Sequence, residues 1–241
     1  MRIASVGSGV SGMVAAYRLS GAHDVTVFEA GKYVGGHTCT VDVEMAGRHY
    51  PVDMGFIVFN HRTYPRFTSL MNGLGVATQT SNMSFSVRCE RTGLEYNGTS
   101  FNTLFAQRLN ALRPSFIRML SEILRFNRDA RAVLALPADG MTLGEYLERE
   151  RYSRDFVERY IVPMGMSVWS ATETAMLGFP VHFFVDFFER HGFLNVNDRP
   201  RWRAVTGGSR EYAKKLTAPY AHNIPVSTPG GGMGGTQTEV V

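Results

Sequence analysis

Residues 2–12 of the chain read RIASVGSGVSG, a short apolar run that leads directly into three closely spaced glycines. The apolar residues 2–6 predict a buried strand, and residues 11–20 have the composition of a helix. Residues 24–29 alternate apolar and polar side chains and end in Glu29, which predicts a second strand. A strand, a glycine-rich turn, a helix and a strand in this order predict a βαβ unit that begins at residue 2.

The three glycines have GxGxxG spacing at the point where the strand gives way to the helix, and this context makes the pattern specific. Gly7 permits the tight turn, Gly9 lets the backbone approach a pyrophosphate, and Gly12 lets the helix pack closely on the strand. The free N–H groups and the positive end of the helix dipole would face the phosphates. Glu29 ends the second strand, where a carboxylate accepts hydrogen bonds from ribose hydroxyls and repels the 2′-phosphate of NADP.

Composition narrows the function classes. The 241 residues are 44% hydrophobic and 19% charged, which fits one or two globular domains. The formal net charge of +4 is not accompanied by a recognisable nucleic-acid-binding module, so we expect no nucleic-acid partner. Cys39 and Cys89 lie far apart without a CxxC pattern, which argues against a disulfide framework or a metal site and indicates a reducing, cytoplasmic location.

Further along the chain, residues 38–43 and 48–52 predict two short strands, and residues 64–72 predict a helix that ends at Gly73. Residues 84–89 and 94–96 predict a hairpin. Apolar residues then recur at helical spacing from residue 101 to about 160, with a capping box at Thr142 and Glu145 and with Pro163 ending the next helix. We therefore expect a discontinuous nucleotide-binding domain of residues 1–75 and 201–226, a helical substrate-binding domain of residues 76–200, and a disordered glycine-rich tail of residues 227–241.

The segment EAGKYVGGHT, residues 29–38, resembles the segment after the second strand in the flavin amine oxidase, phytoene desaturase and protoporphyrinogen oxidase superfamily. Members usually carry a basic residue at the position of Tyr33 and an arginine at that of His37. The resemblance implies that the Gly35–Gly36 pair contacts phosphate and that its usual cationic support is either weakened or left to His37. Further motifs, DMGFIVFN at 53–60, PMG at 163–165 and the stretch 202–212, resemble a bacterial group of amine-oxidase-like FAD/NAD-binding proteins over about residues 1–226.

This resemblance implies an α/β fold with a Rossmann-like FAD-binding βαβ unit and an inserted, largely helical substrate domain. FAD is the expected cofactor, and neither a catalytic residue nor a metal ligand is assigned. The cofactor-binding residues expected from the motif and the resemblance are Gly7, Gly9, Val10, Ser11, Gly12, Glu29, Ala30, Gly35, Gly36, His37, Thr38, Gly55, Phe56 and Val226.

The resemblance implies an FAD-dependent oxidoreductase that transfers a hydride from an apolar or lipid-like small-molecule substrate to flavin. Two alternatives stay open: a non-catalytic nucleotide-binding module or inactive truncated fragment, and an NAD-dependent dehydrogenase, which the diglycine disfavours. Proteins of the group are usually longer, and the match stops near Val226. We therefore expect the FAD-binding domain to be incomplete at its C-terminus.

Two further patterns allow two interpretations each. Four phenylalanines between residues 183 and 188 indicate either the core of a buried helix or the wall of an apolar substrate cavity. Six arginines between residues 108 and 131 alternate with apolar residues. They indicate either a solvated helix face or a peripheral contact with anionic lipid at the inner face of the membrane. The oligomeric state is left open.

Overall fold

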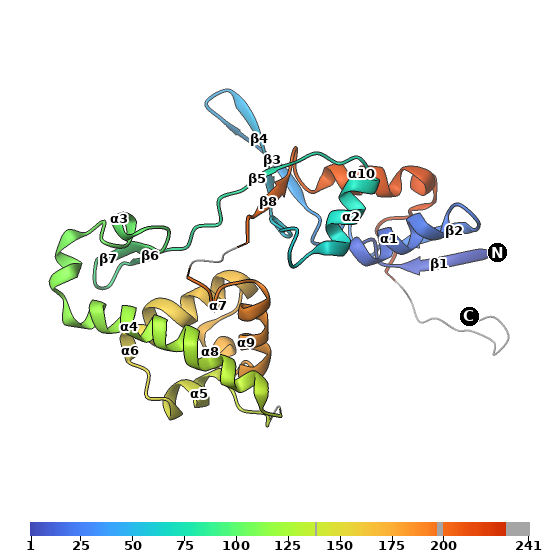
Figure 1. Ribbon diagram of the computed structural model, residues 1–241. Helices are drawn as coiled ribbons and strands as arrows, with labels where there is room; N and C mark the ends of the chain where they lie inside the picture. Colours follow the sequence, from blue (N-terminus) through green and yellow to red (C-terminus); the bar gives the residue numbers. More distant parts are fainter. Residues whose placement is uncertain (138, 197–199, 230–241) are drawn as a thin grey trace. The chain divides into compact units, whose positions relative to one another are not determined.

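The structure, a computed structural model, describes residues 1–137, 139–196 and 200–229 (Figure 1). The chain forms two compact units: Met1–Ser81 combines with the segment that begins at Arg201, and Asn82–Pro200 forms the other. The first unit extends to Ser81 rather than to residue 75, because β5 (Thr78–Thr80) pairs antiparallel with β8 (Arg203–Val205). We call them the first and the second unit.

The first unit opens with β1 (Arg2–Val6), α1 (Val10–Leu19) and β2 (Asp24–Phe28), each within one residue of its expected bounds. The two strands are parallel and in register from Arg2↔Asp24 to Val6↔Phe28. The apolar side of α1 is fully buried at Met13 and Ala16, and apolar burial of this kind supplies most of the stability of a short amphipathic helix.

The later elements of the first unit come from distant parts of the sequence. An antiparallel ribbon consists of β3 (Thr40–Met45) and β4 (Arg48–Asp53), and α2 (Pro65–Gly73) follows it. After the second unit, α10 (Arg210–Thr217) packs against α1, and the short helix η4 (Ala218–Asn223) packs against β2. The core that these elements share contains Met13, Phe59, Met71, Val205, Tyr212 and Leu216.

Asp53 at the end of β4 joins the two sequence-distant parts of the first unit. Its carboxylate accepts hydrogen bonds from the N–H and the hydroxyl of Ser209, both at 2.8 Å, and from the hydroxyl of Thr40 at 2.6 Å. Gly208 makes this approach possible, since a Cβ there would lie 2.4 Å from Cγ2 of Thr40. Residues 207–209 are therefore held directly on the ribbon.

The end of the described chain pairs with the segment that follows β2. Glu29 N–H donates to the carbonyl of Pro225 at 3.0 Å, while the N–H groups of Ser227 and Thr228 donate to the carbonyls of Gly31 and Glu29, both at 2.8 Å. The prediction that the disordered tail begins at residue 227 is wrong for these residues, because backbone hydrogen bonds hold them against the segment that follows β2. The rest of the predicted tail, residues 230–241, lies outside the described residues.

The second unit is largely helical and has its own core around Phe126, Phe156 and Phe184. A hairpin precedes the helices, and its turn contains Gly93 at a φ of 64°. The elements in order are β6 (Ser86–Cys89), β7 (Leu94–Asn97), α3 (Phe101–Leu104), η1 (Arg108–Leu112), α4 (Pro114–Asp129), η2 (Ala130–Ala135), α5 (Leu143–Arg149), α6 (Arg154–Phe156), η3 (Val157–Ile161), α7 (Val162–Trp169), α8 (Glu173–Leu177) and α9 (Val181–Arg190).

Three predictions concern the ends of helices: a capping box, a proline and a glycine. The capping box predicted at Thr142 and Glu145 is confirmed, with the reciprocal hydrogen bonds at 3.2 and 2.8 Å. The prediction that Pro163 ends a helix is wrong: Pro163 lies in the first turn of α7, directly after the π-helical turn η3. A wide π turn before the proline changes the local hydrogen-bonding pattern, so the missing N–H is tolerated there. The prediction that this helix ends at Gly73 is confirmed, since Gly73 is the last residue of α2, and Gly75 adopts the left-handed conformation, at a φ of 59°, two residues later.

Among the described residues, the structure has no helix that is long and apolar enough to cross a membrane.

The Asp53 contact generates a testable expectation. Asp53→Ala leaves the buried N–H and hydroxyl of Ser209 without their acceptor, so the free energy of unfolding should fall by about 1–3 kcal/mol. Urea denaturation followed by circular dichroism measures this change. Asp42→Ala, which removes an exposed ion pair with Arg210 from the same ribbon, is the matched control and should cost much less. Equal losses in the two variants would contradict the assignment.

Candidate functional site

The glycine-rich turn between β1 and α1 forms the floor of the candidate site. Gly7 has a φ of 88°, a left-handed conformation that favours glycine. A Cβ on Gly12 would lie 2.0 Å from the carbonyl oxygen of Gly7, so this glycine is what lets the helix approach the strand, as the sequence predicts. A Cβ on Gly9, in contrast, would meet no atom within 4 Å. The turn therefore has open space at its middle glycine.

The N-terminus of α1 points backbone donors at this open space. The first hydrogen bond of the helix runs from the N–H of Met13 to the carbonyl of Gly9 at 2.9 Å. The N–H groups of Val10 and Ser11, both exposed, consequently fall outside the intrahelical pattern. A helix end of this kind carries a partial positive charge and suits an anionic group.

Glu29 is fixed from two sides. Its Oε2 accepts hydrogen bonds from the N–H of Ser8, at 2.8 Å, and from the Ser8 hydroxyl. Its Oε1 accepts from the N–H of Gly31 at 2.6 Å. These donors favour the charged carboxylate, so the pKa of Glu29 lies below its ordinary value, with the Ser8 hydroxyl as the largest cause.

The diglycine lies against the glycine-rich turn, although 23 residues or more separate the two in sequence. Gly35 N–H donates to the hydroxyl oxygen of Ser8 at 3.0 Å. A Cβ on Gly36 would lie 3.3 Å from the Cα of Gly9, and Gly36 has a φ of 59°. The hydroxyl of Ser8 thus joins the turn, the end of β2 and the diglycine.

The segment that follows the diglycine passes close to residues 54–56. The N–H of Phe56 donates to the carbonyl of His37 at 3.0 Å, and a Cβ on Gly55 would lie only 2.2 Å from that same oxygen. Gly55 is thus required by backbone packing. The Phe56 ring makes edge contacts with Phe67 at 5.1 Å and with other core rings, so this side chain supports the site from inside the unit.

Thr38 ties the same segment to α10. The hydroxyls of Thr38 and Tyr212 lie 2.7 Å apart, and both residues are buried. The side chain of His37 is exposed next to this contact. Ala30 is exposed beyond Glu29, and Val226, also exposed, is flanked by the two residues that bond to the backbone at Glu29 and Gly31.

The structure therefore brings the sequence-predicted residues of the first unit together from four segments, residues 7–12, 29–38, 53–56 and 225–228. Sequence reasoning missed Ser8 and Tyr212 as members of this site. Ser8 occupies a variable position of the GxGxxG pattern, which carries no signal of its own, and Tyr212 is 174 residues from its partner Thr38.

The residues present fit an adenine dinucleotide. The open space at Gly9, the N–H groups at the start of α1 and the adjacent Gly36 backbone suit a pyrophosphate, which needs donors and close backbone approach. Glu29 keeps acceptor capacity for one further donor, because a carboxylate offers about four lone-pair positions and three of them accept from Ser8 and Gly31. The chemical character of this cradle is that of a site for a nucleotide without a 2′-phosphate.

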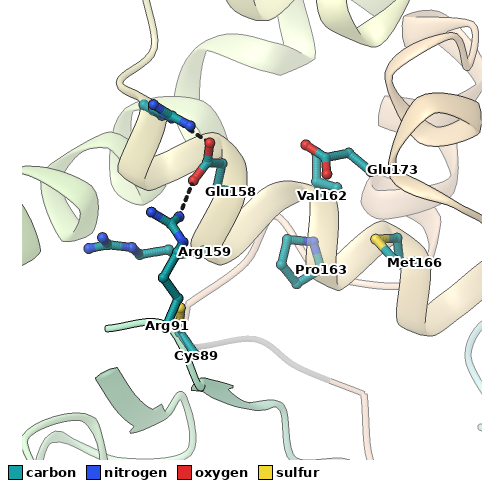
Figure 2. Close-up of a pocket in the computed structure, with 9 residues that line it drawn as sticks. Cys89, Arg91, Glu158, Arg159, Val162, Pro163, Met166 and Glu173 are labelled. Carbon is teal, nitrogen blue, oxygen red and sulfur yellow. Dashed lines mark hydrogen bonds and ion pairs between the residues drawn. The ribbon is translucent and has the colours of Figure 1, made fainter. Parts of the chain in front are cut away.

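A separate pocket lies in the second unit. Figure 2 shows this pocket, whose volume is about 510 Å³, between the β6–β7 hairpin and the segment from α6 to α8. Glu158 pairs with Arg91 at 2.9 Å and with Arg154, and Arg159 pairs with Asp155 at 2.7 Å. Glu158 and all three arginines of the wall thus take part in ion pairs, and the wall contains none of the predicted cofactor-binding residues.

The phenylalanine-rich helix α9 belongs mainly to the core. Phe184 and Phe188 are buried and stack on each other with ring centroids 4.2 Å apart, and Trp169 covers them at 5.6 and 6.5 Å. Burial lowers the pKa of His191, which caps this helix and stacks on Phe187 at 3.8 Å. Of the two interpretations of this stretch, the packing favours the helix core.

Comparison with known proteins gives a consistent match. Residues 10–226 match the family described as flavin containing amine oxidoreductase. Cyclohexylamine oxidase from Brevibacterium oxydans IH-35A is similar at a TM-score of 0.69 and 18% identity, over 95% of this chain and 51% of that one. Putrescine oxidase bound to putrescine is similar at a TM-score of 0.62 and 19% identity, over 94% of this chain and 51% of that one.

An oxidoreductase from Methanosarcina mazei is also similar, at a TM-score of 0.53 and 15% identity, over 94% of this chain and 51% of that one. A search of curated proteins found no match. The chain shares the mixed helix and strand fold of these structures and spans about half of their length.

The Ser8–Glu29 contact predicts a pH-dependent effect. At pH 7, Ser8→Ala should lower the free energy of unfolding by about 1 kcal/mol, the typical contribution of such a hydrogen bond. Because the contact depresses the folded-state pKa of Glu29, its contribution is present above the unfolded pKa of about 4.3 and is lost as the pH falls through the lower folded value. The difference between native protein and variant should therefore narrow on acidification.

Urea unfolding at several pH values between 7 and 3.5 measures this difference. Ser20→Ala, which removes a hydroxyl bonded to the carbonyl of Tyr17 away from any carboxylate, is the control and should show a pH-independent effect. A Ser8→Ala difference that stays constant with pH would argue against the assignment.

Proposed function

The chain belongs to the flavin containing amine oxidoreductase family, whose members are FAD-dependent oxidoreductases, and we propose that its first unit is the Rossmann-like FAD-binding domain of such an enzyme. The observation that carries this proposal is the junction of three features at Gly9: open space at its Cα, the N-terminus of α1, and the backbone of Gly36. These are the features that a bound pyrophosphate needs.

Each segment of the site has a proposed role toward FAD. The turn from Gly7 to Gly12, with the N–H groups of Val10 and Ser11, holds the pyrophosphate from below, and Gly35, Gly36 and His37 hold it from the other side. Glu29 accepts hydrogen bonds from the ribose hydroxyls, and Ala30 and Val226 lie beside the adenosine. The segment of Thr38, Gly55 and Phe56 supports the flavin-proximal part.

The second unit is proposed as the inserted substrate domain. FAD supplies the electron acceptance when it is bound, so the protein has to bind the substrate, orient it and exclude water. We propose an apolar or lipid-like substrate whose C–N or C–C bond is oxidised to a double bond, as a C–H bond gives up a hydride to the flavin and the neighbouring atom loses a proton. The name of one solved relative, cyclohexylamine oxidase, supports both a carbon bonded to nitrogen and an apolar group.

Gly9→Asp should abolish FAD binding to this chain. The carboxylate would occupy the open space at Gly9 and place a negative charge where the pyrophosphate binds. Calorimetric titration with FAD and with ADP measures the loss. Gly21→Asp, at the opposite end of α1, also meets no atom within 4 Å and is the matched control, for which we expect unchanged affinity. Undiminished affinity in Gly9→Asp would exclude the turn as the phosphate site.

Glu29 should determine the choice between nucleotides. We expect the native chain to bind ADP more tightly than adenosine 2′,5′-bisphosphate, because the carboxylate accepts ribose hydroxyls and repels a 2′-phosphate. Glu29→Gln should weaken ADP binding roughly tenfold and reduce the preference for ADP over adenosine 2′,5′-bisphosphate. Glu44→Gln, on the exposed ribbon, is the control. Tighter binding of the 2′-phosphorylated nucleotide by the native chain would contradict the assignment.

A further inference from the structure

The second unit exposes apolar side chains on two consecutive elements, η1 and α4. Leu109 and Leu112 in η1 are 70% and 79% exposed, and they lie on the same side of this 3₁₀-helix because residues three apart eclipse each other. Asn110, between them, is buried. The turn therefore directs a polar side chain inward and two leucines outward, which is the reverse of the usual arrangement.

The outer face of α4 continues this pattern with charge beside the apolar residues. Phe116, Met119 and Phe126 bury one side of the helix, and Ile117 and Leu124, seven residues apart, form an exposed row on the other. Arg118, which follows Ile117, is exposed beside this row, whereas the guanidinium of Arg125 lies over the Tyr152 ring at 4.1 Å from its centroid. Exposed apolar residues bordered by arginines are typical of helices that lie on a membrane surface.

Positive charges outnumber negative charges in this part of the chain. Residues 101–131 contain six arginines and two carboxylates, which gives a formal charge of +4, equal to that of the whole chain. Glu122 is directed inward: its side chain is 7% exposed and accepts hydrogen bonds from the N–H and hydroxyl of Ser153. Asp129 pairs with its neighbour Arg128. Arg118 contacts Glu122 at 3.3 Å and Arg131 pairs with Glu189 at 2.8 Å. Most of the uncompensated positive charge of this surface therefore lies at the exposed Arg108 and Arg113.

We propose that η1 and α4 form a docking surface for an anionic lipid bilayer, with Leu109, Leu112, Ile117 and Leu124 entering the headgroup region and the arginines contacting lipid phosphates. The positive charge opposes pairing of this surface with a second copy of the chain. Nucleic-acid phosphates would match the arginines and leave the exposed leucines uncovered, whereas an anionic bilayer satisfies both groups. The proposal does not depend on the cofactor site, since every residue in it belongs to the second unit.

Cosedimentation of the whole 241-residue chain with vesicles tests this surface. We expect binding to vesicles of phosphatidylglycerol and phosphatidylcholine, weakening as salt is added, and little binding to phosphatidylcholine alone. Leu109→Ser/Leu112→Ser should reduce the partition coefficient by about tenfold or more, and Arg108→Gln/Arg113→Gln by about fivefold for each arginine. All four side chains are exposed, so these variants should keep the native circular dichroism spectrum.

Two matched controls lie elsewhere in the same unit. Leu136→Ser removes an exposed leucine outside η1 and α4, and Arg149→Gln removes an exposed, ion-paired arginine of α5. Both should bind vesicles like the native chain. The proposal is overturned by equal binding to neutral and anionic vesicles, by equal losses in control and test variants, or by a native chain that binds no vesicles. Self-association in gel filtration that Leu109→Ser/Leu112→Ser abolishes would assign the surface to a second copy instead.

Discussion

The hydroxyl of Ser8 is the interaction on which the geometry of the first unit's site depends. This one group donates to Glu29 and accepts from the N–H of Gly35, and so holds the glycine-rich turn, the end of β2 and the diglycine in one arrangement. Ser8 is fully buried, where a lost hydrogen bond leaves polar groups without compensation from water. These hydrogen bonds fix the segments around Gly9 to each other. The space beside Gly9 stays open because no side chain fills it.

Segments that are distant in sequence also hold this site together. Asp53 holds residues 207–209 on the ribbon, the hydroxyl of Tyr212 meets that of Thr38, and residues 225–228 extend the pairing beside Glu29. Each contact joins a residue that precedes the second unit in sequence to one that follows it. The candidate cofactor site is therefore a property of a discontinuous unit, and substitutions more than 150 residues from Gly9 can alter it.

The elements that sequence reasoning predicted well are those with local causes. The bounds of β1 and β2, the spacing of the three glycines and the capping box at Thr142 all have causes within a few residues. The predicted burial of β1 is wrong, since none of its residues is buried and Val6 is 61% exposed. The hydroxyl of Ser8 could not be predicted as a contact, since its partners are 21 and 27 residues away and the GxGxxG pattern leaves its position variable. The prediction that Pro163 ends a helix is wrong because the effect of this proline depends on the preceding π turn. The glycine-rich composition after residue 229 favoured a disordered tail, although Ser227 and Thr228 pair with the segment that follows β2.

The central claim is that an adenine nucleotide binds where the glycine-rich turn meets the diglycine. Titration of the ¹⁵N-labelled chain with ADP, followed by amide chemical shifts, tests it most directly because each glycine reports separately. The account predicts that the amides of Gly9, Val10, Ser11 and Gly36 shift together in a saturable way and that those around the second-unit pocket at Arg91 and Arg159 do not. Saturable shifts confined to the second unit, with the Gly9 and Gly36 amides unmoved, would contradict it.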